Sequence, residues 1–370
     1  MEERIAKANG SRLCFCRSLR TLSQPLSVNG SFLRTMPQLL IIQPSSLGDI
    51  VHGLQVAATL KAQRPEIRIS WIVRDIFEPL VRNCEIVDRT YVFHRSEGVR
   101  GFLKLMREVR QTQFDDVFDM QGLLRTGLMT WLTRATLKVG RSDAREGSTL
   151  FYRRKIPLPP EGEQSHALDI LLNFCTVLDA RAELGGELRF REAADLNLSF
   201  VEGNHGQKPI LIFPDSRLDE KRWNGFRQLT DLLLRDGSGR KVIWAGNNLL
   251  SYRENFPDGQ FLNLTGNTSL ASLAALVRRA DWVICNDSGP LHLAAALRVK
   301  TLGLFGPTDP RLFGPYPLNS PTNHVVQAPV GDLRLLPARD VYARFARLDA
   351  LSRGQAAPGT AAPWSRRAPL

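Results

Sequence analysis

The sequence contains few cysteines and no long apolar run, and both shortages limit what the protein can be. Five cysteines are scattered among 370 residues, an odd number without the spacing of a metal site or a disulfide framework. We therefore expect reduced thiols in a cytosolic protein. No stretch approaches the roughly 18 uninterrupted apolar residues that a membrane-spanning helix needs. The sequence predicts a protein that lies against a membrane at most.

Sequence motifs for nucleic-acid binding and for dinucleotide binding are also missing. We find no aromatic-and-basic RNA-binding motif, no DNA recognition helix and no G-x-G-x-x-G dinucleotide loop. The net charge is +12, but residues 1–36 contribute +4 and residues 352–370 contribute +3, which leaves +5 for the middle of the chain. This mild positive balance suits an acidic substrate or an anionic membrane surface, and it does not require nucleic acid.

Strand, turn and helix patterns alternate along most of the chain and predict two doubly wound α/β domains with parallel sheets. A length of 370 residues allows two domains of ~150 residues each, and the polar, turn-rich stretch 192–209 marks the boundary between them. The predicted parts are a disordered leader or upstream extension at 1–36, Rossmann-like domains at 37–198 and 206–336, a helix at 337–351 that packs towards the first domain, and a disordered tail at 352–370. A transit peptide within the leader is an alternative that the sequence leaves open.

The strongest local signal is NDSGPLHLAAALRVKTLGLFGPTDP, residues 286–310, which reads as a turn, a helix and a second strand. Ser288, Gly289 and the free N–H groups at the helix start would favour a phosphate, and Gly289 would let that ligand come close. His292 lies one turn into the helix, where its ring could reach the phosphate or the Asp287 carboxylate. On spacing alone, an equally good interpretation is that Asp287 and Ser288 only cap the helix and His292 packs beside them.

A similar strand, turn and helix pattern occurs near the start of the first domain. The loop at residues 44–48 follows an apolar strand, and Asp49 opens a helix that Pro65 ends. Ligands of open parallel sheets bind beyond the carboxyl ends of the strands, so Asp49 would face a cleft. From the sequence pattern alone, a helix-stabilising charge is the more common role of such a carboxylate.

Both stretches resemble the signature of glycosyltransferase family nine, the ADP-heptose:lipopolysaccharide heptosyltransferases. The resemblance rests on D-S-G-x-x-H-x-A-A-A followed by L-F-G-P-T-D-P, and on P-S-S-L-G-D-I-V-H near the first strand. The stretches FDMQGLLR and RSDARE are similar to the member that adds the first heptose to Kdo. The resemblance spans roughly residues 38–350 and implies a GT-B fold, with the acceptor in the first domain and the nucleotide-sugar in the second.

The resemblance also implies roles for particular residues. Asp49 would be the catalytic base, and Lys221 would be catalytic by neutralising the departing diphosphate. The implied donor-binding residues are Ser216, Arg217, Lys221, Asp287, Ser288, Gly289 and His292. The implied acceptor-binding residues are Ser46, Gly48, Arg95 and Arg145.

Two positions depart from the family pattern, and one histidine stays unassigned. Gln43 stands where a basic residue is common, and residues 246–250 lack the glutamate that can hold the nucleotide ribose, for which Asn248 is the candidate substitute. We expect His166 to be structural, because it lies far along the chain from both motifs.

The resemblance implies an inverting, metal-independent transfer of heptose from ADP-heptose to the Kdo region of the lipopolysaccharide inner core, without a cofactor. The implied partners are the nucleotide-sugar donor, an anionic Kdo-lipid A acceptor and the cytoplasmic face of the inner membrane, with no nucleic acid and a monomeric enzyme. Open alternatives are another nucleotide-sugar or a later core acceptor, a non-catalytic nucleotide-binding protein of the same fold, and a nucleotide-sugar epimerase.

Overall fold

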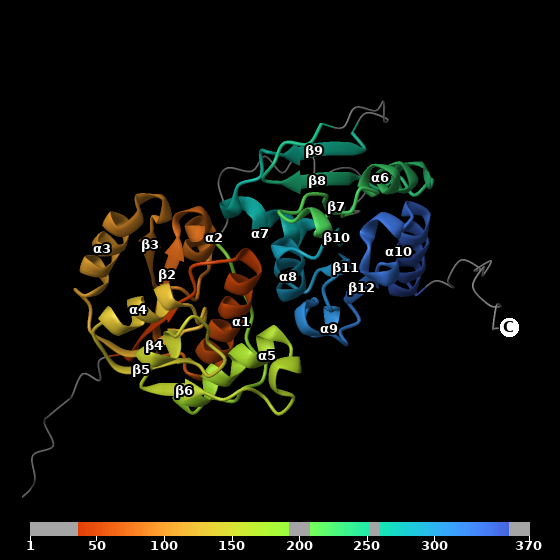
Figure 1. The fold of residues 1–370 in the computed structure, drawn as a ribbon. Helices are drawn as coiled ribbons and strands as arrows, with labels where there is room; N and C mark the ends of the chain where they lie inside the picture. Colours follow the sequence, from red (N-terminus) through yellow and green to blue (C-terminus); the bar gives the residue numbers. More distant parts are fainter. Residues whose placement is uncertain (1–35, 192–207, 252–258, 355–370) are drawn as a thin grey trace, which may run out of the picture. The chain divides into compact units, whose positions relative to one another are not determined.

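The computed structural model describes residues 36–191, 208–251 and 259–354, which belong to one unit that begins at Met36 (Figure 1). Most of the predicted leader, most of the predicted tail and the predicted boundary between residues 198 and 206 lie outside the described residues.

The first half of the chain forms a parallel six-stranded sheet in the order β3-β2-β1-β4-β5-β6. At its centre, Leu39 and Ile41 contribute to one apolar cluster, while Leu40 and Ile42 contribute to the cluster on the other face. Burial on both faces explains why this strand is a continuous apolar run. The strands are β1 (Gln38–Ile42), β2 (Arg68–Arg74), β3 (Arg89–Phe93), β4 (Phe114–Asp119), β5 (Ala135–Arg141) and β6 (Arg154–Ile156). The helices are α1 (Leu47–Gln63), α2 (Glu78–Asn83), α3 (Gly98–Val109), α4 (Leu124–Leu132) and α5 (Ala167–Leu172).

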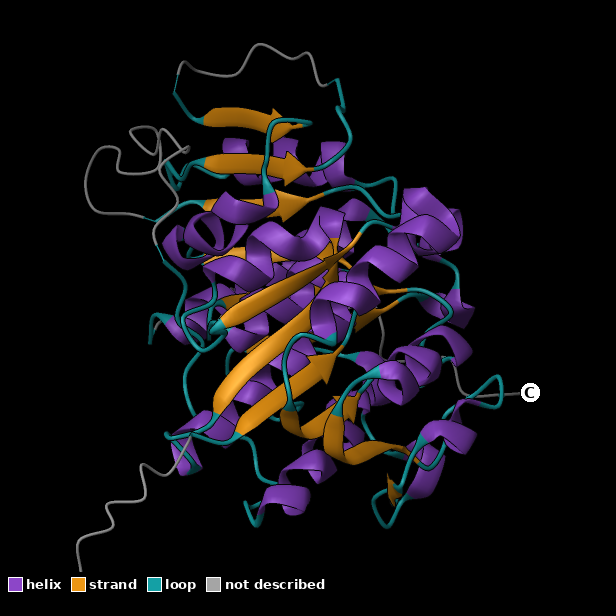
Figure 2. Ribbon diagram, turned by 90° about the vertical axis from the view of Figure 1, so that its left-hand side faces the viewer, coloured by secondary structure: helices purple, strands orange, loops and turns teal. Residues whose placement is uncertain are grey.

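The second half repeats this plan with a parallel sheet in the order β12-β11-β10-β7-β8-β9. Figure 2 shows helices flanking the strands. The two parallel sheets confirm the predicted α/β fold class. The strands are β7 (Ile210–Phe213), β8 (Val242–Gly246), β9 (Phe261–Thr265), β10 (Trp282–Asn286), β11 (Lys300–Phe305) and β12 (Asn323–Gln327). The helices are α6 (Phe226–Arg235), α7 (Leu270–Arg279), α8 (Gly289–Ala296), α9 (Pro310–Phe313) and α10 (Ala338–Ser352).

One hydrophobic cluster joins the two halves. It contains Ile41 of β1, Val51 of α1, Val283 of β10 and Leu291 of α8. Helix α1 packs directly against α8, and both helices begin at the carboxyl end of a central strand. The shared core therefore brings the first turns of α1 and α8 to the same place.

The last helix packs differently from the prediction. Its buried residues Val341, Phe345 and Leu348 belong to the apolar cluster of the second half, where α10 packs against α6. The Asp349 carboxylate accepts hydrogen bonds from Arg240 and from the Trp282 indole, which ties the helix to the second sheet. The prediction that this helix packs towards the first domain is wrong, because its apolar face is covered by the second half.

The apolar periodicity of residues 165–178 is that of one amphipathic helix, but in the structure this stretch divides into two helices. Helix α5 ends at Leu172, and a 3₁₀ helix follows from Asn173 to Leu178. The Asn173 side chain donates to the Pro157 carbonyl, and the Thr176 hydroxyl donates to the Asn173 carbonyl. These side-chain hydrogen bonds compete with regular helix geometry.

Candidate active site

The first turns of α1 and α8 touch because both contain a glycine. A Cβ on Gly48 would lie 2.8 Å from His292 Cδ2, and a Cβ on Gly289 would lie 2.5 Å from Leu47 Cγ. Gly289 was predicted to give a phosphate close access, but in the structure the space beside it is filled by Leu47. The glycines allow two helix N-termini, each with a partial positive charge, to meet at one point.

Asp49 lies in the first turn of α1 and is tied to the residue that caps the helix. The backbone N–H and the hydroxyl of Ser46 both donate to Asp49 Oδ2, each at 2.9 Å. The helix-stabilising role considered from the sequence is therefore present. The bonds fix the orientation of a half-buried carboxylate whose Oδ1 has no hydrogen-bond partner within the described residues. That oxygen can still accept a proton, so capping and catalysis are compatible.

Lys221 and Asp287 form an ion pair beside the start of α8. Lys221 Nζ lies 2.5 Å from Asp287 Oδ2, and the Thr308 hydroxyl donates to the same oxygen at 2.7 Å. The neighbouring Asn286 is fully buried, accepts from the Trp223 N–H at 3.0 Å and holds the loop that carries the lysine. The lysine is therefore positioned at a helix N-terminus by the carboxylate of the D-S-G stretch.

Three buried histidines lie beside these groups. The ring centroids of His52 and His292 are 4.6 Å apart, and those of His52 and His166 are 5.7 Å apart. Burial lowers the pKa of His292 to about 4, against the opposing effect of the nearby Asp287 carboxylate. Burial also lowers the pKa of His52 and His166. All three are therefore neutral at neutral pH, and none supplies positive charge for a diphosphate.

His166 shows why distance along the chain was a poor guide. Its Nε2 lies 3.1 Å from the Gly314 carbonyl, and its Nδ1 accepts from the Leu168 N–H at 3.1 Å. Both ring nitrogens are therefore engaged within the protein. Its ring nevertheless lies next to the site, because α5 packs against α1.

Comparisons with known proteins identify the family of the chain. The profile of glycosyltransferase family 9 (heptosyltransferase) matches residues 102–329, more than half of the chain. The chain belongs to glycosyltransferase family 9. It is 26% identical over 301 residues to a lipopolysaccharide core heptosyltransferase of Haemophilus influenzae, covering 77% of this chain and 83% of the relative. It is 26% identical over 328 residues to lipopolysaccharide heptosyltransferase 1 of Escherichia coli K12, covering 84% of this chain and the whole relative.

The fold of this family 9 transferase matches solved heptosyltransferases. An E. coli heptosyltransferase solved with ADP superimposes with a TM-score of 0.68 at 22% identity, covering 84% of this chain and 99% of that chain. The E. coli heptosyltransferase II gives a TM-score of 0.66 at 20% identity, covering 85% and 99%. The GT-B arrangement predicted from the resemblance is thereby confirmed. The chain is a glycosyltransferase, which sets aside the epimerase and the non-catalytic alternatives.

The other predicted donor residues of the transferase lie on loops that follow β7 and β8. Ser216 is buried and accepts a hydrogen bond from the Arg222 guanidinium through its backbone carbonyl, while Arg217 is exposed. The exposed Asn248 donates from its amide to the Asp215 carboxylate.

The predicted acceptor residues lie at the carboxyl edge of the first sheet. Ser46 and Gly48 follow β1, and the exposed Arg95 and Arg145 follow β3 and β5. Because all strands are parallel, these loops share one edge. No hydrogen bond or ion pair engages either guanidinium within the described residues, which leaves both able to bind an anion.

Sequence reasoning did not identify the residues that hold the loop containing Arg145. The Asp119 carboxylate accepts from the Gln121 and Gly122 N–H groups and from the Tyr152 hydroxyl, and the Gly122 carbonyl accepts from the Arg145 N–H at 2.8 Å. Burial raises the pKa of Asp119 to about 6. The signal for these residues is the FDMQGLLR stretch, which carries part of the family resemblance. Thr308 likewise lies within the L-F-G-P-T-D-P stretch, whose spacing alone gives it no role.

Proposed function

We propose that the protein transfers heptose from ADP-heptose to the Kdo region of the lipopolysaccharide inner core, with inversion at the anomeric carbon and without a metal. The proposal rests on one observation. An oriented carboxylate, Asp49, and a positioned cation, Lys221, lie together at the contact between α1 and α8. The relatives named lipopolysaccharide heptosyltransferase 1, and a solved E. coli heptosyltransferase bound to an ADP-heptose analogue, support this choice of substrates.

The proposed reaction is a single displacement. Asp49 Oδ1 accepts the proton of an acceptor hydroxyl as its oxygen attacks the anomeric carbon of heptose. The bond from that carbon to the diphosphate oxygen breaks on the opposite face, and its electron pair leaves with ADP. The new glycosidic bond therefore has the inverted configuration.

The leaving diphosphate gains negative charge, which needs compensation. Lys221 and the N–H groups at the start of α8 supply it, and the Asp287 ion pair keeps the ammonium in place before the donor binds. The described residues contain no group of three His, Cys, Asp or Glu side chains placed to hold a metal ion. The compensating charge in our proposal comes from the protein itself, and no cofactor takes part.

The acceptor is proposed to be anionic. Arg95 and Arg145 lie on the same sheet edge as Asp49 and can bind the carboxylates or phosphates of a Kdo-lipid A acceptor. Arginine suits this task because its planar guanidinium donates two hydrogen bonds to one anionic group.

Such an acceptor is anchored in a membrane, and we propose that helix α3 lies against the cytoplasmic face of the inner membrane. Val99 and Leu103, spaced one helical turn apart, are 75% and 56% exposed. Arg100, Lys104 and Arg107 are exposed on the same helix, so apolar and cationic side chains occur together on its outer surface. None of the described helices combines the length and the hydrophobicity that a transmembrane span requires.

The direct test is release of ADP on mixing the protein with ADP-heptose and Kdo-lipid A. We expect release only when donor and acceptor are both present, with a mass increase of the acceptor by one heptose. Nucleotide release with another nucleotide-sugar but not with ADP-heptose would contradict the proposal that ADP-heptose is the donor. Other nucleotide-sugars are worth testing because Asn248 stands where the ribose-binding glutamate is common in the family. Transfer only to an acceptor that already carries heptose would point to a later core position.

A further inference from the structure

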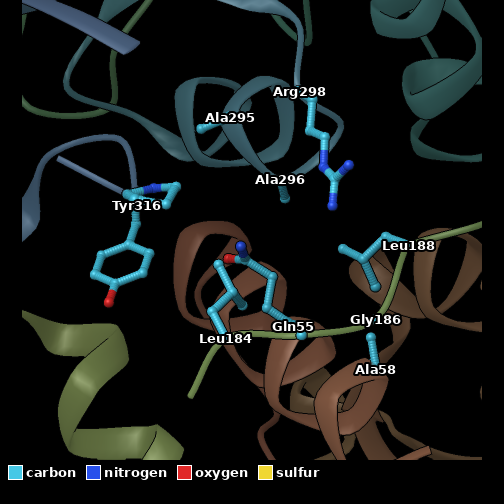
Figure 3. A pocket seen from close by; sticks show the side chains of 11 residues that line it. Gln55, Ala58, Leu184, Gly186, Leu188, Ala295, Ala296, Arg298 and Tyr316 are labelled. Carbon is cyan, nitrogen blue, oxygen red and sulfur yellow. The ribbon is translucent and has the colours of Figure 1, made fainter. Parts of the chain in front are cut away.

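A cavity of about 290 Å³ lies behind the candidate active site, where α1 packs against α8. Its walls come from both halves of the chain, including Ala58 on α1, Leu188 on the segment after α5, and Ala296 on α8. Figure 3 shows these side chains around a common space. The cavity is at the lower end of the size range of small-molecule sites.

One buried polar side chain points into this cavity without a partner. Gln55 of α1 is only 6% exposed and lines the cavity, yet its side-chain amide makes no hydrogen bond to any described residue. Figure 3 shows the amide directed into the space below α8. Because no described protein group engages this amide, it is free to donate to or accept from a ligand in the cavity.

The charge at the cavity is positive. Arg298 follows α8, and Figure 3 shows its guanidinium extending towards the same space. It makes no ion pair within the described residues, and it is the one charged residue among those that line the cavity. A guanidinium and an amide that face one space can together bind a carboxylate or a phosphate.

The rest of the wall is apolar and fixed. The Tyr316 hydroxyl donates to Asp169 at 2.7 Å, which leaves the side of its ring for the cavity. Gly186 has a φ of +76°, and a Cβ there would lie 2.4 Å from the Ala58 carbonyl oxygen, so only glycine lets this segment pass so close to α1. A ligand with an apolar body and an anionic end fits these walls.

We propose that this cavity binds a small organic carboxylate or phosphate, separately from the transfer site. Gln55 is six residues along α1 from Asp49, a distance of about 9 Å along the helix axis. The cavity is therefore close enough to share α1 and α8 with the transfer site, but it uses different side chains.

The test uses phenyl phosphate as the probe and isothermal titration calorimetry as the readout, on the full chain saturated with ADP. ADP occupies the proposed donor site and prevents the probe from binding there. We expect phenyl phosphate to bind in the presence of ADP, whereas benzyl alcohol, which lacks the anion, binds at least tenfold more weakly. If ADP itself does not bind, the proposed function is contradicted but the cavity proposal is not. The phenyl phosphate titration is then carried out without ADP.

Two variants and one control locate the binding. Arg298 has a left-handed backbone with a φ of 58°, which asparagine tolerates, so Arg298→Asn removes the guanidinium without backbone strain. Gln55→Leu removes the amide and keeps a similar shape. We expect each to weaken phenyl phosphate binding about tenfold, while Arg347→Asn on the exposed surface of α10 has no effect. Absence of probe binding at millimolar concentration, complete competition by ADP, or equal effects of the Arg298 and Arg347 variants would overturn the proposal.

Discussion

Lowering the pH should destabilise the protein through the buried histidines, and His292 gives the clearest case. Burial lowers its pKa in the folded state to about 4, whereas an unfolded histidine titrates at about 6.5. Between these values the unfolded chain binds a proton and the folded protein does not. The contribution of His292 to stability is therefore complete above about pH 6.5 and is lost as the pH falls towards 4.

The size of the effect follows from the same two pKa values. From pH 6.5 to pH 5.0, each pH unit costs about 1.4 kcal/mol, so one histidine accounts for about 2 kcal/mol of lost unfolding free energy. The measurement is urea unfolding at pH 7.5 and pH 5.0 for the wild type and for His292→Leu, which cannot titrate. Asp119, whose folded pKa of about 6 acts in the opposite direction, is present in both proteins and cancels.

We expect the wild type to lose about 2 kcal/mol more than His292→Leu over this pH range. Equal losses in the two proteins would refute the reasoning, because they would mean that His292 is accessible to protons in the folded state. If the substitution shifts the urea midpoint by the same amount at both pH values, the result would show only that the substitution alters packing.

Three further predictions concern the proposed function. Treatment with EDTA should leave transfer essentially intact, because Lys221 and a helix end supply the positive charge; activity that returns only with added Mg²⁺ or Mn²⁺ would contradict this. Arg145→Ala should raise the acceptor KM far more than the donor KM, and Arg145→Lys should recover only part of the loss; a larger change in the donor KM would move Arg145 to the nucleotide. Reversing the charges of Arg100 and Lys104 to Glu should reduce flotation with phosphatidylglycerol vesicles, whereas Arg347→Glu on α10 should not; equal losses would argue against α3 as the membrane face.

Much of the fold could be predicted from the sequence, because its central strands are continuous apolar runs bounded by turn residues. The edge strands β6 and β12 could not. The strand β6 is only Arg-Lys-Ile with two exposed residues, and β12 has polar residues at both ends. Neither shows the apolar pattern of a central strand, since an edge strand is buried less and pairs on one side only.

The residues of the site could be predicted from motifs, but their arrangement in space could not. Asp49 and Asp287 could be selected because each begins a helix after a buried strand, and this is a local property. The contact between His52 and His292 and the placement of Leu47 against Gly289 depend on how α1 packs on α8. Contacts between residues more than two hundred positions apart leave no trace in local spacing.

The central claim is that Asp49 removes the acceptor proton, and Asp49→Asn tests it most directly. The asparagine carbonyl can still accept both hydrogen bonds from Ser46, so the cap of α1 is kept while the base is lost. We predict that kcat falls on the order of 10²- to 10⁴-fold with nearly unchanged ADP affinity. The matched control Asp340→Asn, in the first turn of α10, should retain full activity. Turnover by Asp49→Asn within about tenfold of wild type, with unaltered ADP affinity, would contradict the account.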